Sequence, residues 1–121
     1  RAIHFLAWVG GKPAGTARVV VHRGSAKIGR MAVLKKYRRR GVGARLLRRA
    51  IVIARRLRPT KIYLHAQVAV IGFYEKFGFR CIGAVFEEAS IAHRKMVLGK
   101  ASGSRQQATR KKDRVRGRGG G

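Results

Sequence analysis

The chain has 121 residues, enough for one compact domain and not for two. Hydrophobic residues make up 45% of it, so most of its length can contribute to a core. Lys and Arg number 30 against 4 Asp and Glu, which gives a formal net charge of +26 at pH 7. Self-repulsion at such a charge destabilises a compact state unless polyanions screen it. We therefore expect a polyanionic partner, with nucleic acid favoured and an anionic membrane surface as the alternative.

Several classes of protein are excluded by the same composition. No run reaches the roughly 18 apolar residues of a membrane-spanning helix. The single Cys81 excludes an internal disulfide and indicates an intracellular, reducing compartment. The few carboxylates leave little room for a hydrolase that needs a pair of them. We predict no metal site, because the histidines lack metal-ligand spacing; they are His4, His22, His65 and His93.

The chain divides into two segments of different character. Residues 1–98 carry regular apolar periodicity and are predicted to form the folded domain. Residues 99–121 have only two alanines and one valine as apolar residues, so they cannot bury enough surface to offset the entropy of ordering. The domain holds 22 basic and 3 acidic residues, and the extension holds 8 and 1. The domain is thus strongly basic even without its Gly- and Arg-rich extension.

The periodicity predicts eight elements in the domain. Strands are expected over residues 3–9, 14–22 and 27–33, with a tight turn at 10–13 between the first two. Residues 42–57 place leucine, isoleucine and alanine at helical spacing and arginines on the opposite face, which predicts a helix. A strand at 61–66, a short helix at 68–77 closed by Gly78, and strands at 79–86 and 93–98 follow. This order predicts an α/β domain with a mixed sheet.

The loop between the third strand and the first helix has the form of a phosphate cradle. Three arginines, Arg38 to Arg40, are followed by Gly41 and Gly43, which let a ligand approach the backbone closely. The exposed N–H groups and the positive end of the helix dipole then face the same point. A diphosphate is the ligand that this arrangement suits. The alternative is a basic loop whose glycines only form the entry to the helix.

A second motif joins the first in resembling the GNAT superfamily of N-acetyltransferases. Arg38-x-x-Gly41-x-Gly43 matches the superfamily's acetyl-CoA signature, (Gln/Arg)-x-x-Gly-x-(Gly/Ala), and Gln67 with the segment 73–79 (FYEKFGF) is similar to its second motif. The segments 29–33 (GRMAV) and 87–93 (EEASIAH) resemble the ElaA-like branch. The resemblance spans about residues 3–98 and implies the GNAT fold, here without the first strand and first two helices. Those missing elements form one wall of the acceptor pocket in the superfamily, and their absence leaves one sheet edge open.

The resemblance also implies roles for individual residues. The main chain of the third strand would pair with the pantetheine arm of acetyl-CoA, and the loop amides and arginines would hold its pyrophosphate. Gln67 would contact the cofactor arm, and Tyr74 would give a proton to the departing thiolate. The cofactor-binding residues implied are Met31, Ala32, Val33, Arg38, Arg39, Arg40, Gly41, Val42, Gly43, Ala44 and Gln67.

Each role has a structural alternative. Tyr74 on an apolar helix can be a core residue with its hydroxyl at the edge, and Gln67 can simply end a strand. His65 and His93 are expected to pack or to form hydrogen bonds rather than to act as bases. Glu87 and Glu88 are either proton acceptors for an amine or loop charges. The third strand lacks the carboxylate base common in the superfamily, which weakens the case for catalysis more than the case for cofactor binding.

The charge predicts a second role beside the cofactor. A single CoA needs only a few cationic contacts, whereas the predicted helix carries arginines with no acidic residues between them. We expect these side chains and the extension to bind RNA through its backbone and shape, since no base-reading motif is present. The predicted RNA contacts are Arg45, Arg48, Arg49, Arg55, Arg56, Arg58, Arg110, Lys111, Lys112, Arg114, Arg116 and Arg118.

Three hypotheses follow for the function. The first is an acetyl-CoA-dependent N-acetyltransferase associated with an RNA-rich assembly such as a ribosome, in the cytoplasm or an organelle such as the mitochondrion. The second is a non-catalytic rRNA-binding protein built on the same fold. The third is a small-molecule acetyltransferase whose charge is incidental. We favour the first, with neighbouring proteins covering the open sheet edge.

Overall fold

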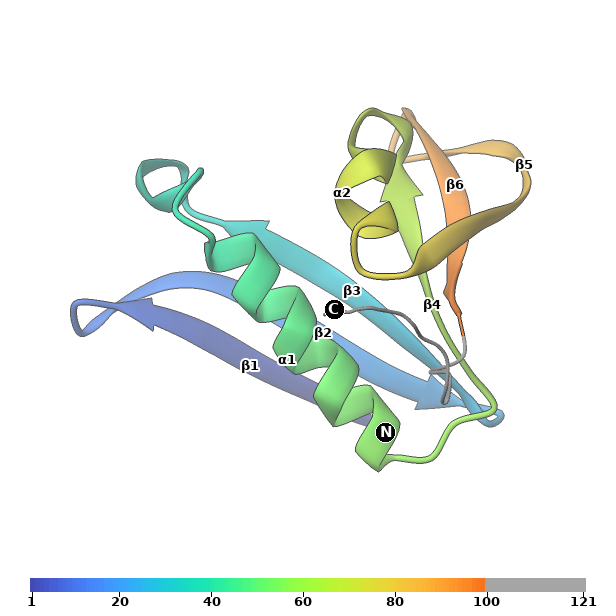
Figure 1. Cartoon of the computed structure of the whole chain (residues 1–121), viewed down its shortest axis with the longest axis horizontal. Helices are drawn as coiled ribbons and strands as arrows, with labels where there is room; N and C mark the ends of the chain where they lie inside the picture. The colour runs from blue at the N-terminus through green and yellow to red at the C-terminus, as the bar shows by residue number, and fades with distance from the viewer. Residues whose placement is uncertain (100–121) are drawn as a thin grey trace.

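A computed structural model describes residues 1–99 and shows a six-stranded sheet with helices on one face (Figure 1). The helices are α1 (Val42–Arg56) and α2 (Ile71–Glu75), and short 3-10 turns lie at Lys35–Tyr37 and Val68–Val70. The strands are β1 (Ala2–Val9), β2 (Lys12–His22), β3 (Ser25–Val33), β4 (Lys61–Gln67), β5 (Phe79–Glu88) and β6 (Ile91–Leu98). The predicted α/β fold with a mixed sheet is confirmed.

The sheet has the strand order β1-β2-β3-β4-β6-β5, with β3 and β4 parallel and every other neighbouring pair antiparallel. The β3–β4 pairing covers only Ser25–Lys27 against Lys61–Tyr63, although both strands run on well beyond it. Figure 1 shows the two strands spreading apart from that point, with α1 over β1–β3 and α2 over β4. We call this divergence the fork.

Helix α1 is fixed by an apolar face that packs on the sheet. Leu47, Ala50 and Ala54 have no exposed surface and lie in one core cluster with residues of β2, β3, β4 and β6, such as Val19 and Met96. Burying a leucine side chain stabilises the fold by about 1.5–3 kcal/mol. The arginines of α1 lie on the face turned to solvent. The 3.6-residue spacing of the apolar residues in the sequence therefore accounts for the way the helix lies on the sheet.

A second core cluster holds the start of α1 against the sheet. Val42 and Leu46 of the first turns pack there with Ala14, Ala17 and the buried Tyr37. Gly15 on β2 makes this close packing feasible, because a Cβ on Gly15 would lie 2.8 Å from the carbonyl oxygen of Ala32 and 2.9 Å from Cδ1 of Leu46. The start of α1 is therefore held at a fixed place beside the end of β3.

Several predicted boundaries are wrong. The strands β2, β3, β5 and β6 each run two residues beyond their predicted bounds, so Glu87 and Glu88 lie at the end of β5 and not in a loop. The helix expected over 68–77 is a 3-10 turn followed by a five-residue α2, which ends early because Gly78 takes φ +95° and its N–H bonds the carbonyl of Glu75. The turn expected at 10–13 is confined to Gly10 and Gly11, since Lys12 and Pro13 already pair with β1. Across residues 1–99, no helix is long and apolar enough to cross a membrane.

Candidate functional site

The start of α1 offers free backbone donors. Gly41 caps the helix at φ +77°, no side chain bonds the cap, and the first turn has no acidic residue. The first helical bond runs from the N–H of Arg45 to the carbonyl of Gly41, at 3.1 Å. The N–H groups of residues 42–44 thus have no partner within the helix and lie at the positive end of its dipole. This geometry can hold an anion such as a pyrophosphate.

The three arginines before the cradle are exposed but not equally free. Arg38 donates from Nε to the carbonyl oxygen of Val33 at 3.1 Å and so braces the end of β3. The guanidinium of Arg40 lies 5.4 Å from the ring centroid of Tyr37, over which Lys36 also lies at 5.1 Å. Arg39 has φ +64°. The structure therefore brings positive charge to the loop, with Arg38 and Arg40 already engaged by neighbouring groups.

The last residues of β3 have one free edge. Ala32 and Val33 pair with β2 through Thr16 and Gly15, while β4 contributes no partner beyond Lys27. On that side β3 has no strand partner beyond Lys27, so backbone groups near its end are open to a ligand, although the carbonyl of Val33 already accepts the bond from Arg38. An added Cβ on Gly43 would lie 3.9 Å from Val33 and 3.8 Å from Phe73, which places Gly43 between the open edge and α2.

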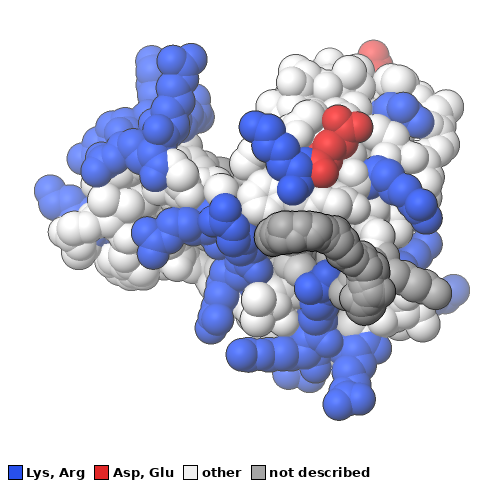
Figure 2. Space-filling view, in the orientation of Figure 1, with Lys and Arg blue, Asp and Glu red and all other residues white. Residues whose placement is uncertain are grey.

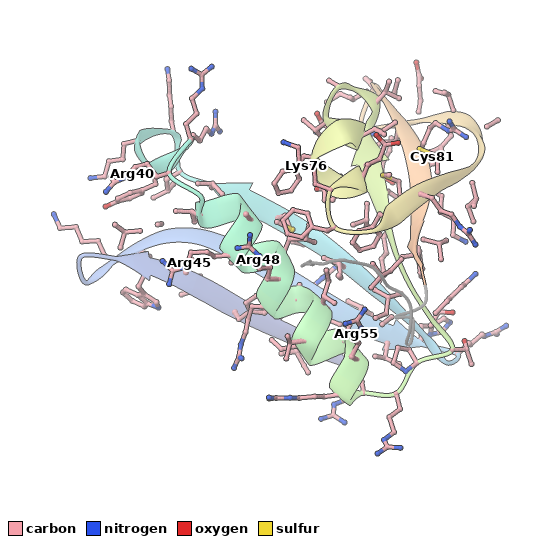
Figure 3. All side chains as sticks on the ribbon, in the orientation of Figure 1. Arg40, Arg45, Arg48, Arg55, Lys76 and Cys81 are labelled. Carbon is pink, nitrogen blue, oxygen red and sulfur yellow. The ribbon has the colours of Figure 1, made fainter. Side chains whose placement is uncertain are left out.

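A cavity of about 680 Å³ lies between α1 and α2, on the helical side of the fork. It is lined by Ala44, Arg48, Phe73, Lys76 and Phe77, and we call it the helix-side cavity. Figure 3 shows Arg48 on α1 and Lys76 just after the end of α2. The guanidinium of Arg48 lies 5.5 Å from the ring centroid of Phe77. No sequence motif points to Lys76, and Arg48, predicted to contact RNA, lines the helix-side cavity.

Tyr74 is half-buried on α2. Its ring lies 5.1 Å from that of Phe73 and 6.2 Å from that of Phe79, both in edge-on geometry. Burial raises the pKa of the Tyr74 phenol above its ordinary value of 10.0. The hydroxyl therefore stays protonated at neutral pH and can donate a proton. Gln67 is exposed at the end of β4, next to the fork.

The opposite face of the sheet carries a cluster of His65, Glu88 and His93. Nδ1 of His65 lies 3.0 Å from Oε1 of Glu88, and Nε2 of His93 lies 3.9 Å from Oε2 of the same carboxylate. The hydrogen bond with His65 is the main cause that lowers the pKa of Glu88, and the charges of His65, His93 and Lys27 add to it. His93 forms its hydrogen bond elsewhere, from Nδ1 to the carbonyl oxygen of Ile91 at 2.7 Å, so both histidines form hydrogen bonds as expected. Glu88 is the shared partner, and no spacing in the sequence could have revealed it.

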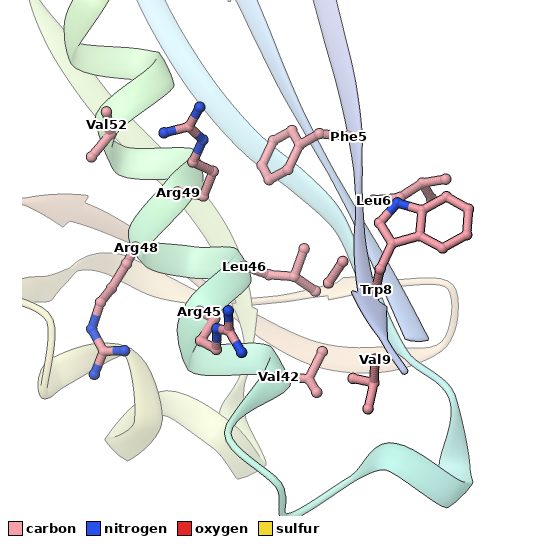
Figure 4. Close-up of a pocket in the computed structure, with 11 residues that line it drawn as sticks. Phe5, Leu6, Trp8, Val9, Val42, Arg45, Leu46, Arg48, Arg49 and Val52 are labelled. Carbon is pink, nitrogen blue, oxygen red and sulfur yellow. The ribbon is translucent and has the colours of Figure 1, made fainter. Parts of the chain in front are cut away.

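A further cavity of about 570 Å³ lies between β1 and α1, at the free edge of the sheet. Figure 4 shows Phe5 and Val9 of β1 directed toward Leu46 and Val42 of α1, whereas Leu6 and Trp8 point to the other side of the sheet. Leu6 is 53% exposed and Trp8 58%. Within the described residues β1 pairs with β2 alone.

The arginines assigned to RNA on α1 are all exposed, as is Arg58 just after the helix. Figure 2 shows Lys and Arg spread over the face that carries α1, with few acidic residues among them. The remaining predicted contacts, Arg110, Lys111, Lys112, Arg114, Arg116 and Arg118, lie outside the described residues. Among residues 1–99, no three His, Cys, Asp or Glu side chains are grouped so as to hold a metal ion.

Comparisons with known proteins match the whole domain. The family model described as "Acetyltransferase (GNAT) domain" matches residues 1–100. A Bacillus subtilis (strain 168) relative described as an acetyltransferase is 34% identical over 90 residues, 74% of this chain and 61% of the relative. The chain thus spans less than two thirds of that relative's length.

Solved structures agree in fold. An acyl-CoA N-acyltransferase from Pseudomonas aeruginosa has a TM-score of 0.72 at 31% identity, and ElaA from Escherichia coli has 0.73 at 27%. Each match covers 81% of this chain and 68% of the other. Together with the cradle at Gly41 and the fork between β3 and β4, these matches show that the chain belongs to the GNAT acetyltransferase family.

Proposed function

We propose that the protein is an acetyl-CoA-dependent N-acetyltransferase in which an amine attacks the thioester directly. The observation that carries this proposal is the meeting of the fork with the uncapped start of α1. An open strand edge there lies beside free N–H donors and a cavity lined by two cationic side chains, Arg48 and Lys76. That combination suits a long ligand with an amide-containing arm and phosphates.

Each part of the site has a part of the ligand to hold. The N–H groups of residues 42–44 bind the pyrophosphate, and Arg48 and Lys76 add charge-assisted contacts to phosphate groups. The open edge of β3 at residues 31–33 pairs with the amides of the arm, much as a further strand would. Gln67 borders the fork from β4 and offers its side-chain amide to the same arm.

The chemistry needs a polarised carbonyl and a protonated leaving group. When bound, acetyl-CoA supplies an activated acetyl thioester. The main-chain N–H groups at the fork orient the carbonyl of that thioester, and they stabilise the negative charge that develops on its oxygen. The Tyr74 hydroxyl stays protonated because burial raises its pKa, and it donates a proton to the sulfur as the C–S bond breaks.

Calorimetric titration of the nucleic-acid-free full chain with acetyl-CoA tests the proposal, with ATP as a polyanion of similar charge. We expect acetyl-CoA to bind at least tenfold more tightly than ATP near physiological salt, because ATP lacks the arm that pairs with β3. Equal affinity for the two would contradict the proposal, since the cradle would then act only as a basic patch.

A second candidate is an association with RNA, which the exposed arginines of α1 favour. Residues 1–98 carry 22 basic and 3 acidic residues, far more charge than one CoA requires. We propose binding to the RNA backbone, in an assembly such as a ribosome in the cytoplasm or an organelle such as the mitochondrion. The affinity for an RNA oligonucleotide should fall steeply with salt, as release of counterions requires. A shallow dependence would leave a small-molecule acetyltransferase as the better description.

In such an assembly the protein could also be a non-catalytic, rRNA-binding scaffold. The titration with acetyl-CoA separates the two hypotheses, because a scaffold has no need to bind the ligand selectively. We further propose that a neighbouring protein covers the free edge of β1 and the cavity beside it, where apolar side chains such as Trp8 stand exposed. Covering this edge would remove a row of unpaired backbone groups.

A further inference from the structure

A small cavity lies on the face of the sheet that α1 and α2 leave uncovered. Alternation along β4 places Ile62, Leu64 and Ala66 in the core beneath the helices, so His65 points to the opposite face. The cavity has a volume of about 160 Å³ and is lined by Arg18, Val20, Lys27, Ile28, Gly29, Arg30, His65 and Glu88. We call it the far-side cavity. Its walls come from β3 and β4 on either side of the fork, and from β2 and the end of β5.

The far-side cavity combines opposite charges. Arg18, Lys27 and Arg30 give it three cationic side chains, and Glu88 gives it one carboxylate. With His65 neutral, three positive charges and one negative charge leave a formal charge of +2. A bare ammonium ion would be repelled by this excess, whereas a group that carries both an amine and an anion can satisfy both sets of charges.

The His65–Glu88 pair is prepared to receive a proton. An ionised carboxylate only accepts hydrogen bonds, so Nδ1 of His65 carries the proton in the 3.0 Å contact with Glu88. The other ring nitrogen, Nε2, then keeps its lone pair. A carboxylate that holds an imidazole in this tautomer also stabilises the imidazolium that forms when Nε2 takes up a proton.

Two of the cationic side chains are held in unusual states. Nε of Arg18 is buried with no hydrogen-bond partner among the described residues. An unpaired buried donor of this kind is costly and needs an acceptor. Arg30 takes φ +54° at an irregularity in the β2–β3 pairing between Thr16 and Arg18. Such bulges often redirect a side chain beside an active site. The unpartnered Nε of Arg18 therefore indicates a site for an anion, and the bulge places Arg30 beside it.

We propose that the far-side cavity is the acceptor site and that it takes a small primary amine carrying a carboxylate or a phosphate. The ammonium group binds at Glu88 and His65, and the anionic group binds at Arg18, Lys27 and Arg30. The assignment rests on the proposed function, because it places the acceptor across the fork from the helix-side cavity. It also supplies the proton acceptor that β3 lacks.

Transfer of the acetyl group forms one N–C bond and breaks one C–S bond. The ammonium group gives one proton to Nε2 of His65, and the nitrogen lone pair forms the N–C bond with the acetyl carbonyl carbon. The C–S bond breaks, its electron pair stays on sulfur, and the sulfur takes a proton from the Tyr74 hydroxyl. The acylated nitrogen loses its second proton to solvent, from which Tyr74 is reprotonated. The products are an amide, a thiol and one proton.

Matched pairs of amines test the substrate class. O-phosphoethanolamine is compared with ethanolamine, and β-alanine with its amide, by following release of the CoA thiol from the full chain. We expect at least a tenfold higher kcat/KM for the anionic member of one or both pairs, since a charge-assisted hydrogen bond contributes about that factor. The pair of amines that shows this preference identifies the anionic group of the substrate as a phosphate or a carboxylate. No preference in either pair would overturn the assignment.

Two variants test whether the preference for an anionic amine arises in the far-side cavity. Arg30→Gln should reduce the preference for the anionic amine about tenfold, because it removes a cation from the cavity wall. Lys95→Gln is the matched control, since Lys95 lies opposite His65 on β6 but does not line the far-side cavity. A similar loss in both variants would mean that only the overall charge matters, and would contradict the assignment.

The proton-accepting role of His65 is tested by a separate variant. The titratable and charged groups that face His65 are Arg18, Lys27, Arg30, Tyr63, Glu88, His93 and Lys95. We expect His65→Asn to lower kcat/KM about a hundredfold while the affinity for acetyl-CoA stays unchanged, because the variant removes the proton acceptor alone. An unchanged kcat/KM in the variant would assign the proton acceptor to another group.

Direct binding separates this inference from the proposed function. Titration of each amine without acetyl-CoA, followed by NMR of the His65 ring, reports on the far-side cavity alone. Tighter binding of O-phosphoethanolamine than of ethanolamine in a chain that does not bind acetyl-CoA would support the cavity and overturn the acetyltransferase. Selective acetyl-CoA binding with equal affinity for the two amines would support the acetyltransferase and overturn the far-side cavity as the acceptor site.

Discussion

Lys27 on β3 and Tyr63 on β4 form the last register pair between the two parallel strands. Beyond this pair the strands separate, and the two faces of the sheet are lined differently. The helical face has the free N–H groups of α1 and the cations Arg48 and Lys76. The other face has the His65–Glu88 pair. A thioester held at the fork would thus be approached by its acceptor from the side opposite its phosphates.

The backbone of the cradle can be tested by a pair of glycine substitutions. Gly41 and Gly11 both have φ +77°, and an added Cβ at either meets no atom within 4 Å beyond its chain neighbours. Gly41→Ala and Gly11→Ala should therefore each lower the free energy of unfolding by about 1–2 kcal/mol through the same left-handed strain. Only Gly41→Ala should also weaken acetyl-CoA binding, by at least tenfold in a calorimetric titration. Equal binding by both variants would show that the start of α1 does not hold the phosphates.

The Tyr74 hydroxyl is tested by Tyr74→Phe, which keeps the ring packing against Phe73 and Phe79. We expect kcat to fall about a hundredfold, the order of magnitude of general acid catalysis, with acetyl-CoA affinity changed less than twofold. Since burial raises the pKa of Tyr74 above the ordinary 10.0, the loss of rate caused by its ionisation should begin at a higher pH than for an exposed phenol. An unchanged kcat would leave Tyr74 with its packing role alone.

The elements that could be predicted from the sequence are those with strong local patterns. The apolar spacing at residues 42–57, with arginines on the opposite face, predicts α1 with an end one residue beyond the observed one. Gly78 predicts the turn that follows α2. The cradle was foreseen because its donors are consecutive in the chain. Glycines 41 and 43 together with the start of a helix define it without any tertiary contact.

The rest depends on contacts between distant residues. His65, Glu88 and His93 meet because β4, β6 and β5 are neighbours in the sheet, an order that no local pattern encodes. Lys76 is one exposed lysine among many in the sequence, and only the approach of α2 to α1 places it in the helix-side cavity. The helix at 68–77 was predicted too long because its apolar residues continue past Glu75, where Gly78 already ends it.

The close packing of α1 on the sheet is tested at Gly15. A methyl group there would press on the backbone oxygen of Ala32, which cannot move without disturbing the β2–β3 pairing. We expect Gly15→Ala to lower the free energy of unfolding by about 1–3 kcal/mol in urea denaturation. Gly29→Ala on β3 is the control, because an added Cβ there meets nothing within 4 Å. A Gly15→Ala protein as stable as the control would mean that α1 packs less closely than described.

The RNA-binding surface is tested by neutralising four exposed arginines of α1 that lie outside the helix-side cavity: Arg45, Arg49, Arg55 and Arg56. Replacing each with Gln keeps the helix propensity and removes four charges. If all four contact phosphates, the slope of log K against log salt for a single-stranded RNA should fall in magnitude by about 3. Acetyl-CoA affinity should stay within twofold, because Arg48 and the cradle are intact.

The matched control carries four Gln substitutions at exposed basic residues of strands and turns: Lys12, Arg23, Lys35 and Arg80. It has the same net charge as the α1 variant, so any difference between the two reflects position and not total charge. We expect its salt slope to stay close to that of the wild type. If both variants lose the same slope, RNA contacts a diffuse basic surface and α1 is not the interface. If neither loses any, the phosphate contacts lie elsewhere in the chain.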